Sequence, residues 1–197
     1  SGTNGRGSFC RWCGWRERVC EKSTLRSHSR YTSMKKRIPP KPGQESVWDY
    51  PRPPKLESVS KHLRVLMGDQ VLADTNRGYR VLETSHPPVY YFPPESVKLY
   101  WLEKCSDRMS HCEFKGQAEY WDFTGPGHEV VEQIAWSYPD PRRAFAPIKD
   151  YLAFYPSKVT ACYVGDEQAR AQEGDFYGGW ITADIVGPFK GGKGTWG

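Results

Sequence analysis

Short apolar runs separated by turn-forming residues follow one another along most of the chain. Leu63–Met67 and Val71–Asp74 flank Gly68, Asp69 and Gln70, a pattern that predicts a β-hairpin. Six further strands are predicted, over Arg80–Thr84, Val89–Phe92, Val97–Leu102, His111–Phe123, Val130–Tyr138 and Lys158–Val164. The turn between the two longest is predicted at residues 124–127. Frequent short strands of this kind are typical of a mainly β, antiparallel domain.

One segment has helical rather than strand spacing. Asp140 is a good N-cap and Pro141 suits the first helical position. Ala144, Phe145, Ile148 and Leu152 then recur at helical intervals. These signals predict one short helix over about residues 141–152, shortened or bent by the internal Pro147.

The segments on either side of the predicted strands are rich in proline on one side and in glycine on the other. Six prolines between positions 39 and 54 predict an extended arm, which Trp48 and Tyr50 would anchor to the body. The glycine-rich stretch from Gly174 contains aromatic residues that would attach it to the sheet: Phe176, Tyr177, Trp180, Phe189 and Trp196. We therefore expect a single compact domain over residues 45–197.

The charge of the chain changes sign between residues 1–44 and the expected domain at residues 45–197. Residues 1–44 hold eleven Lys and Arg against two Glu, whereas the remainder holds seventeen basic and twenty-one acidic residues. A mildly acidic body argues against nucleic-acid binding by the folded part, although a basic leader leaves that open for residues 1–44. No stretch approaches the roughly 20 apolar residues of a membrane span, so we expect no membrane partner.

Residues 1–44 are interpreted as a basic leader or extension outside the fold, with Met34 as a native start. Arg- and Ser-rich leaders also resemble organelle transit peptides. Cys10, Cys13, Cys20 and His28 offer four zinc donors, but Cys20 and His28 are too far apart to form a second close pair. The six cysteines do not look like a disulfide framework, which favours a reducing, cytoplasmic compartment.

Seven motifs follow in order after the leader. They lie at Glu45–Pro54, Arg80–Pro93, Cys112–Gly116, Ala135–Pro141, Ala153–Pro156, Gly174–Trp180 and Asp184–Gly191. Together they resemble the family known as domain of unknown function 427, over about residues 45–197. The resemblance implies a β-tent fold, the architecture of cereblon's ligand-binding domain, Yippee proteins and methionine sulfoxide reductase B.

Many proteins of that architecture hold zinc between two cysteine knuckles, and the family is sometimes labelled nucleotidyltransferase. The body has Cys105, Cys112 and Cys162 but no close pair, so we predict no metal there. Its one acid-x-acid triplet, Glu173 to Asp175, lies in a glycine-rich loop. Residues 187–195 resemble a phosphate-binding loop, but only two residues follow, so the helix that such a loop needs is not predicted. We expect no cofactor.

Three residues are the candidate catalytic groups. Alternation places Glu83 on the same strand face as apolar Val81, where a carboxylate is either paired, for example with Lys115, or functional. Lys115 is either half of that salt bridge or an anchor for an anionic ligand. His86 lies at a Pro-Pro bend and is either catalytic or a surface-turn histidine. Cys112 is a nucleophile or a buried structural cysteine.

Aromatic residues of the strands supply a candidate ligand wall. The predicted ligand-binding residues are Tyr91, Tyr120, Trp136, Tyr138, Tyr155 and Arg80. Alternation turns Tyr120 and Trp121 to opposite faces, whereas Trp136 and Tyr138 share one. The first hypothesis is a small-molecule-binding domain, with catalysis left open; its rival is an interaction module that holds a peptide or modified side chain in the same groove.

Overall fold

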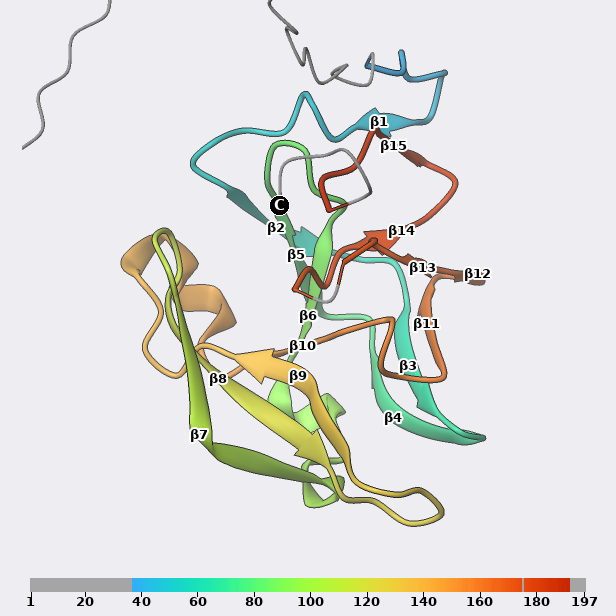
Figure 1. Cartoon of the computed structure of the whole chain (residues 1–197). Coiled ribbons are helices and arrows are strands. Elements are labelled where there is room, and N and C mark those ends of the chain that lie inside the picture. Colours follow the sequence, from blue (N-terminus) through green and yellow to red (C-terminus); the bar gives the residue numbers. More distant parts are fainter. Residues whose placement is uncertain (1–36, 175, 192–197) are drawn as a thin grey trace, which may run out of the picture. The chain divides into compact units, whose positions relative to one another are not determined.

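The computed structural model describes residues 37–174 and 176–191, all within the second of two units into which the chain divides, Ser33–Gly197. The arrangement is mainly β, as predicted (Figure 1). No helix of the described part is long and apolar enough to cross a membrane. The zinc donors of the leader, Met34, Asp175 and residues 192–197 lie outside the described residues.

The larger sheet has seven antiparallel strands. Its order is β2 (Lys55–Val59), β5 (Gly78–Leu82), β6 (Val89–Phe92), β10 (Leu152–Phe154), β9 (Val131–Ser137), β8 (Gly116–Phe123) and β7 (Leu102–Cys112). A second antiparallel sheet has the order β12 (Glu167–Gln168), β11 (Ala161–Val164), β3 (Leu63–Met67) and β4 (Gln70–Thr75). Figure 1 shows β7, β8 and β9 at the lower left and β3, β4 and β11 at the lower right.

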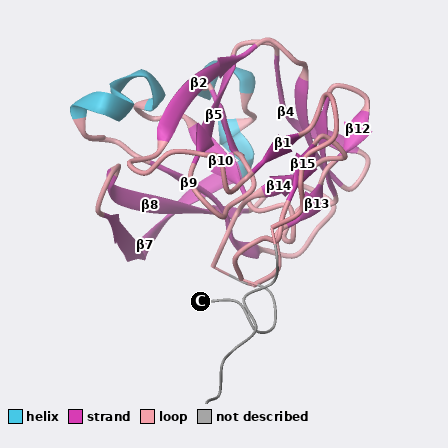
Figure 2. Ribbon diagram, turned by 90° about the horizontal axis from the view of Figure 1, so that it is seen from above, coloured by secondary structure: helices cyan, strands magenta, loops and turns pink. Residues whose placement is uncertain are grey.

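Two short pairs complete the domain. Strand β1 (Glu45–Ser46) pairs in parallel with β15 (Ile185–Val186), and β13 (Arg170–Ala171) pairs with β14 (Trp180–Ile181). Figure 2 shows both pairs from above. The predicted anchors hold the arm, because Tyr50 and Trp48 pack in a small apolar cluster that includes Ile185 of β15. The arm at residues 39–54 and the glycine-rich stretch from Gly174, described over residues 176–191 and called the closing segment below, therefore hold each other in place.

The main core fills the space between the two larger sheets. In β3, Leu63, Val65 and Met67 are buried and the residues between them are not, as the period of two requires. They pack against one face of the seven-stranded sheet, in a cluster with Phe92 and Phe154. The opposite face of that sheet carries a separate cluster around Trp136, Tyr138 and Phe145.

The predicted helix is shorter and of a different type. It is the 3-10 helix η3 (Arg143–Ile148), preceded by Arg142 with no side-chain cap, so Asp140 does not cap it. Pro147 has no N–H for an α-helical bond, and Phe145 and Ile148, three residues apart, both face inward as a 3-10 helix allows. Leu152, the last predicted helical contact, belongs to β10 instead.

Two of the predicted strands are also corrected. Val97–Leu102 contains the 3-10 helix η2 (Leu99–Trp101), and a third such turn, η1 (Pro94–Ser96), precedes it. His111–Phe123 is not one strand but the end of β7, a turn and β8. Gly116, with φ +104°, starts β8 in a conformation that other residues rarely adopt.

Candidate functional site

Strand register places large aromatic rings side by side on one face of the seven-stranded sheet. Tyr120 of β8 is opposite Trp136 of β9, Trp136 is opposite Ala153 of β10, and Ala153 is opposite Tyr91 of β6. Directly opposite residues share a face, so these side chains form one row. Ala118, two residues before Tyr120, adds a small side chain to the same face. Because Ala118 and Ala153 are much smaller than the rings beside them, unfilled space remains on this face of the sheet.

A cavity of about 310 Å³ occupies that space. Eight of the nine predicted site residues line it: Glu83, His86, Lys115, Tyr91, Tyr120, Trp136, Tyr138 and Tyr155. Trp121, the neighbour of Tyr120, packs against the main core on the other side of the sheet, as alternation predicts. The residues that the sequence put forward from four separate segments therefore meet at one place.

A tight turn after β5 positions Glu83 and His86. The His86 N–H donates to the Glu83 carbonyl across 3.0 Å, and Ser85 between them has φ +71°. A left-handed serine is unfavourable by roughly 1–2 kcal/mol. The arm holds the turn, because the Ser85 N–H donates to the Val47 carbonyl and the Thr84 hydroxyl donates to the Tyr50 carbonyl.

Glu83 pairs with an arginine rather than with Lys115. Its Oε1 lies 3.4 Å from Nη1 of Arg52, and the Arg52 Nη2 lies 2.5 Å from Oε1 of Glu113. The Glu83 side chain is 22 % exposed and that of Arg52 is 56 % exposed, so solvent screens this pair. The salt bridge considered for Glu83 and Lys115 is absent among the described residues.

Lys115 is buried at the edge of the cavity. It is 9 % exposed, and its Nζ lies 6.0 Å from the ring centre of Tyr138 and 5.8 Å from that of Phe145. The Lys115 carbonyl accepts from the N–H of Arg142, which holds the turn that leads into Gly116. Within residues 37–174 and 176–191, no carboxylate pairs with this ammonium group.

His86 is held in one tautomer. Its Nδ1 lies 2.9 Å from the Thr84 carbonyl, which only accepts, so Nδ1 carries the proton and Nε2 of the neutral ring is an acceptor. Burial lowers the pKa of His86 below its ordinary value; Lys190 and Lys115 act in the same direction, while Glu83 and the Thr84 carbonyl oppose it. The imidazole is therefore neutral at neutral pH.

The buried tyrosines are also neutral. Burial raises the pKa of Tyr91, Tyr138 and Tyr155 well above that of a solvated phenol. Neutral phenols keep their O–H donors, which can hydrogen-bond an anion. Tyr120 is held differently, with its hydroxyl 2.8 Å from the Ser110 Oγ.

The closing segment forms the remaining wall. Gly178 lies so close to the Trp136 ring that a Cβ at this position would collide with Cη2. The Gln172 side-chain amide donates to the Lys190 carbonyl across 2.7 Å, which ties the end of the segment to the chain just before it. The Tyr177 ring packs against the His86 ring at an interplanar angle of 56°, with 5.0 Å between ring centres, and the Lys190 Nζ lies 5.5 Å from the Tyr177 ring centre.

Several cavity residues were not predicted as site residues. They include Arg52, Ser110, His111, Gln172, Phe176, Tyr177 and Lys190, and also Cys112, which was weighed as a nucleophile or a buried structural cysteine. Arg52, Tyr177 and Lys190 belong to three of the motifs that resemble the family. Membership of these motifs, which lie outside the predicted strands, could have identified them as site candidates.

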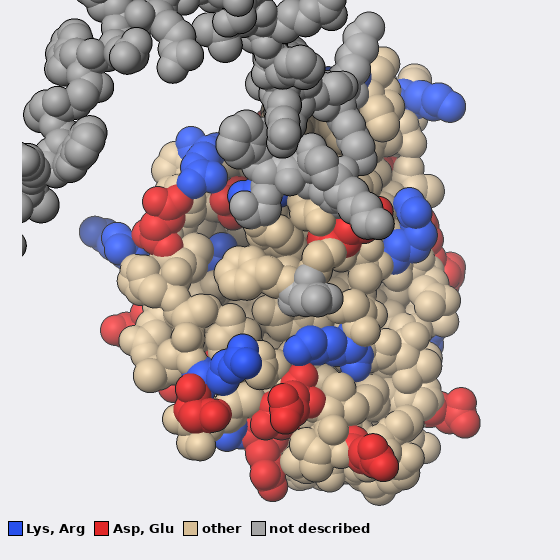
Figure 3. Space-filling model, in the orientation of Figure 1, with Lys and Arg blue, Asp and Glu red and all other residues tan. Residues whose placement is uncertain are grey.

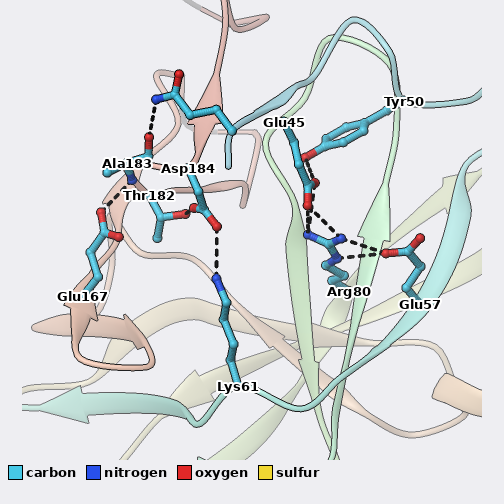
Figure 4. A network of polar contacts seen from close by, with 10 residues as sticks. Glu45, Tyr50, Glu57, Lys61, Arg80, Glu167, Thr182, Ala183 and Asp184 are labelled. Atoms are coloured by element: carbon cyan, nitrogen blue, oxygen red, sulfur yellow. Dashed lines mark hydrogen bonds and ion pairs between the residues drawn. The ribbon is translucent and has the colours of Figure 1, made fainter. Parts of the chain in front are cut away.

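Arg80 lies in a different place, outside the lining of the cavity. Its guanidinium contacts Glu45 at 3.1 Å and Glu57 at 2.8 Å, and the Tyr50 hydroxyl donates to Glu45 (Figure 4). Arg80 therefore connects the arm with β2 and β5. It does not join the other eight predicted site residues in the lining of the cavity.

The three cysteines of the body do not fit a zinc knuckle. Cys162 is buried in the main core, Cys105 donates to Asp122 across 3.0 Å and Cys112 lines the cavity. Burial raises the pKa of the Cys105 thiol to about 11. In the described part of the chain, His, Cys, Asp and Glu form no group of three or more that could hold a metal ion.

The cavity differs in charge from the outer surface. Figure 3 shows one face of the domain, where Lys and Arg side chains are interspersed with Asp and Glu around uncharged residues. Among the described residues, the cavity lining instead contains Arg52, Lys115 and Lys190 and one carboxylate, that of Glu83. Its charge therefore suits an anion.

A family model described as "Domain of unknown function (DUF427)", with the short name NTP_transf_9, matches residues 55–165. The match covers more than half of the chain and includes all eight predicted residues that line the cavity. Arg52 and the closing segment lie outside it. No curated protein matches the sequence.

Proposed function

The chain belongs to the DUF427 family, and we propose that its domain binds a small anionic molecule with an aromatic or apolar body. The ligand's carboxylate or phosphate pairs with Lys115, and its body lies against the rings of Tyr91, Trp136 and Tyr155. The family description names no ligand, so the proposal rests on the cavity.

The single observation that carries the proposal is the state of Lys115. An ammonium group that is 9 % exposed and has no carboxylate partner among the described residues is costly to bury. Contacts with the faces of two aromatic rings offset part of this cost. A ligand anion would supply the counter-charge that no described carboxylate gives to Lys115.

Size and polarity agree with a small ligand. The volume of about 310 Å³ is near the lower end for small-molecule sites, which are mostly apolar with a few convergent polar groups. Here those polar groups are Lys115, Lys190, the phenols and the His86 Nε2. Lys115 and Lys190 both lack a carboxylate partner in the described ranges, which favours an anion over a neutral ligand.

A thermal-shift screen of the full chain against a metabolite library identifies candidate ligands, because a ligand present at 100 times its Kd adds about 2.7 kcal/mol of stability. Matched pairs then test the charge: benzoate against benzamide, and phenyl phosphate against phenol, by isothermal titration calorimetry. The anion of each pair is expected to bind more tightly, and Lys115→Met to weaken it at least about tenfold.

Two results would contradict the proposal. One is equal binding of the anion and its neutral partner. The other is an anion affinity that survives Lys115→Met in a variant whose unfolding curve matches that of the natural sequence.

The alternative function is recognition of a peptide or modified side chain in the same cavity. Phe176 favours it, because this ring lines the cavity and is nevertheless 71 % exposed. An exposed aromatic ring at a cavity margin suits a partner that extends beyond the cavity. Phe176→Ala separates the two functions: it leaves the affinity for benzoate unchanged in the first and lowers the affinity for a longer peptide in the second.

A further inference from the structure

A second cavity adjoins the first. It has a volume of about 200 Å³ and is lined by Arg108, Met109, Ser110, Tyr120, Gln133, Tyr155, Lys158 and Phe176. Four of these residues also line the larger cavity: Ser110, Tyr120, Tyr155 and Phe176. The two spaces are therefore neighbours that share a wall of two tyrosines, a serine and an exposed phenylalanine.

The second cavity is also basic. Arg108 donates to the amide oxygen of Gln133 across 3.3 Å, and the Lys158 ammonium donates to the backbone carbonyl of Glu132 across 3.1 Å. Both acceptors are neutral, so neither cation is compensated by them. The described residues that line it include no carboxylate. Each of the two adjoining cavities thus has cations that an anion could neutralise.

From this arrangement we propose that the ligand carries two anionic groups joined by an apolar chain. One anion pairs with Lys115 in the larger cavity, the chain crosses the shared wall at Tyr120 and Tyr155, and the second anion reaches Arg108 and Lys158. This inference rests on the proposed function and names the class of ligand: a linear dicarboxylate or an equivalent dianion.

The rise per residue of a β-strand gives an approximate length for such a ligand. Lys115 immediately precedes β8, in which Gly116 and Tyr120 are four residues apart, roughly 13 Å along the strand. The Lys115 and Arg108 side chains shorten this span. Sebacate, a flexible dicarboxylate, is a suitable probe, and monomethyl sebacate is its matched monoanion with nearly the same length and apolar surface.

Titration calorimetry of the full chain with these two probes tests the inference. Sebacate is expected to bind about tenfold more tightly than monomethyl sebacate, the contribution of one further charge-assisted contact. The double change Arg108→Gln with Lys158→Met should abolish this advantage and leave the affinity for the monoester unchanged. Lys149→Met removes an exposed lysine outside both cavities and should change neither affinity.

The outcomes separate the inference from the proposed function. If neither the monoester nor benzoate binds, the proposed function fails and the inference falls with it. If the monoester binds through Lys115 but sebacate has no advantage, the second subsite is wrong and the proposed function stands. A sebacate advantage that persists in the Arg108 and Lys158 double variant would also overturn the subsite.

Discussion

The two faces of the seven-stranded sheet are made from the same strands, yet one is filled and the other is hollow. On the filled face, Phe92 and Phe154 are fully buried against a second sheet. The opposite face, with Tyr91 and Trp136, is covered by η3, the turn at residues 83–86 and the closing segment. A continuous sheet matches the pleated surface closely, whereas short irregular pieces leave space and bring polar groups to it.

The largest expected effect concerns the filled face. Phe154→Ala should lower the free energy of unfolding by about 3–5 kcal/mol, because it opens a void in a packed core. Tyr120→Ala on the hollow face is the matched change; it enlarges a cavity that already exists, so the loss should be only about 1 kcal/mol. Denaturant unfolding measures both. Equal losses would mean that the two faces are packed alike.

The second contrast concerns two cations, Arg80 on β5 outside the cavity and Lys115 in the cavity lining. Arg80→Met leaves Glu45 and Glu57 without their shared partner and should destabilise by about 1–3 kcal/mol. Lys115→Met removes a buried charge with no carboxylate partner among the described residues, so stability should stay the same or rise by up to about 1 kcal/mol. Thermal and denaturant unfolding compare the variants. A large loss from Lys115→Met would identify a structural role for this lysine.

The smallest expected effect is a pH dependence from His86. Its pKa is lowered in the folded state, so the unfolded chain binds more protons as the pH falls below about 6.5. The stability that the neutral ring contributes is therefore complete above that pH and is lost as the pH falls toward the folded pKa.

Unfolding free energies of the natural sequence and of His86→Gln, measured between about pH 7.5 and 5, test this expectation. The natural sequence should lose more stability over this range than the variant. Parallel pH profiles would show that His86 titrates alike in the folded and unfolded chain.

Sequence predicted the fold best where burial is strong. The strands at Leu63–Met67 and Val89–Phe92 occur as predicted, because their apolar residues are packed on the sheet interior. β7 was largely missed, since this edge strand is polar and mostly exposed and has no clear period of two. The helix was overestimated because Pro147 and the inward residues Phe145 and Ile148 suit a 3-10 turn.

The site could be predicted where strand alternation determined it. The pattern that turns Val81 and Glu83 to one face turns Arg80 to the other, so alternation itself argued against Arg80 as a cavity residue. Arg52 and Lys190 could not be placed in the same way. They come from the arm and the closing segment, whose positions depend on tertiary contacts rather than on local periodicity.

The proposed function depends above all on an anion held at Lys115 on the hollow face of the sheet. A crystal structure of the full chain with 4-iodobenzoate tests it directly, because the anomalous signal of iodine fixes the orientation of the probe. The carboxylate is expected within about 4 Å of the Lys115 Nζ, with the iodine among the rings of Trp136 and Tyr155. Iodobenzoate bound with its carboxylate turned away from Lys115, or bound only elsewhere on the domain, would contradict the claim.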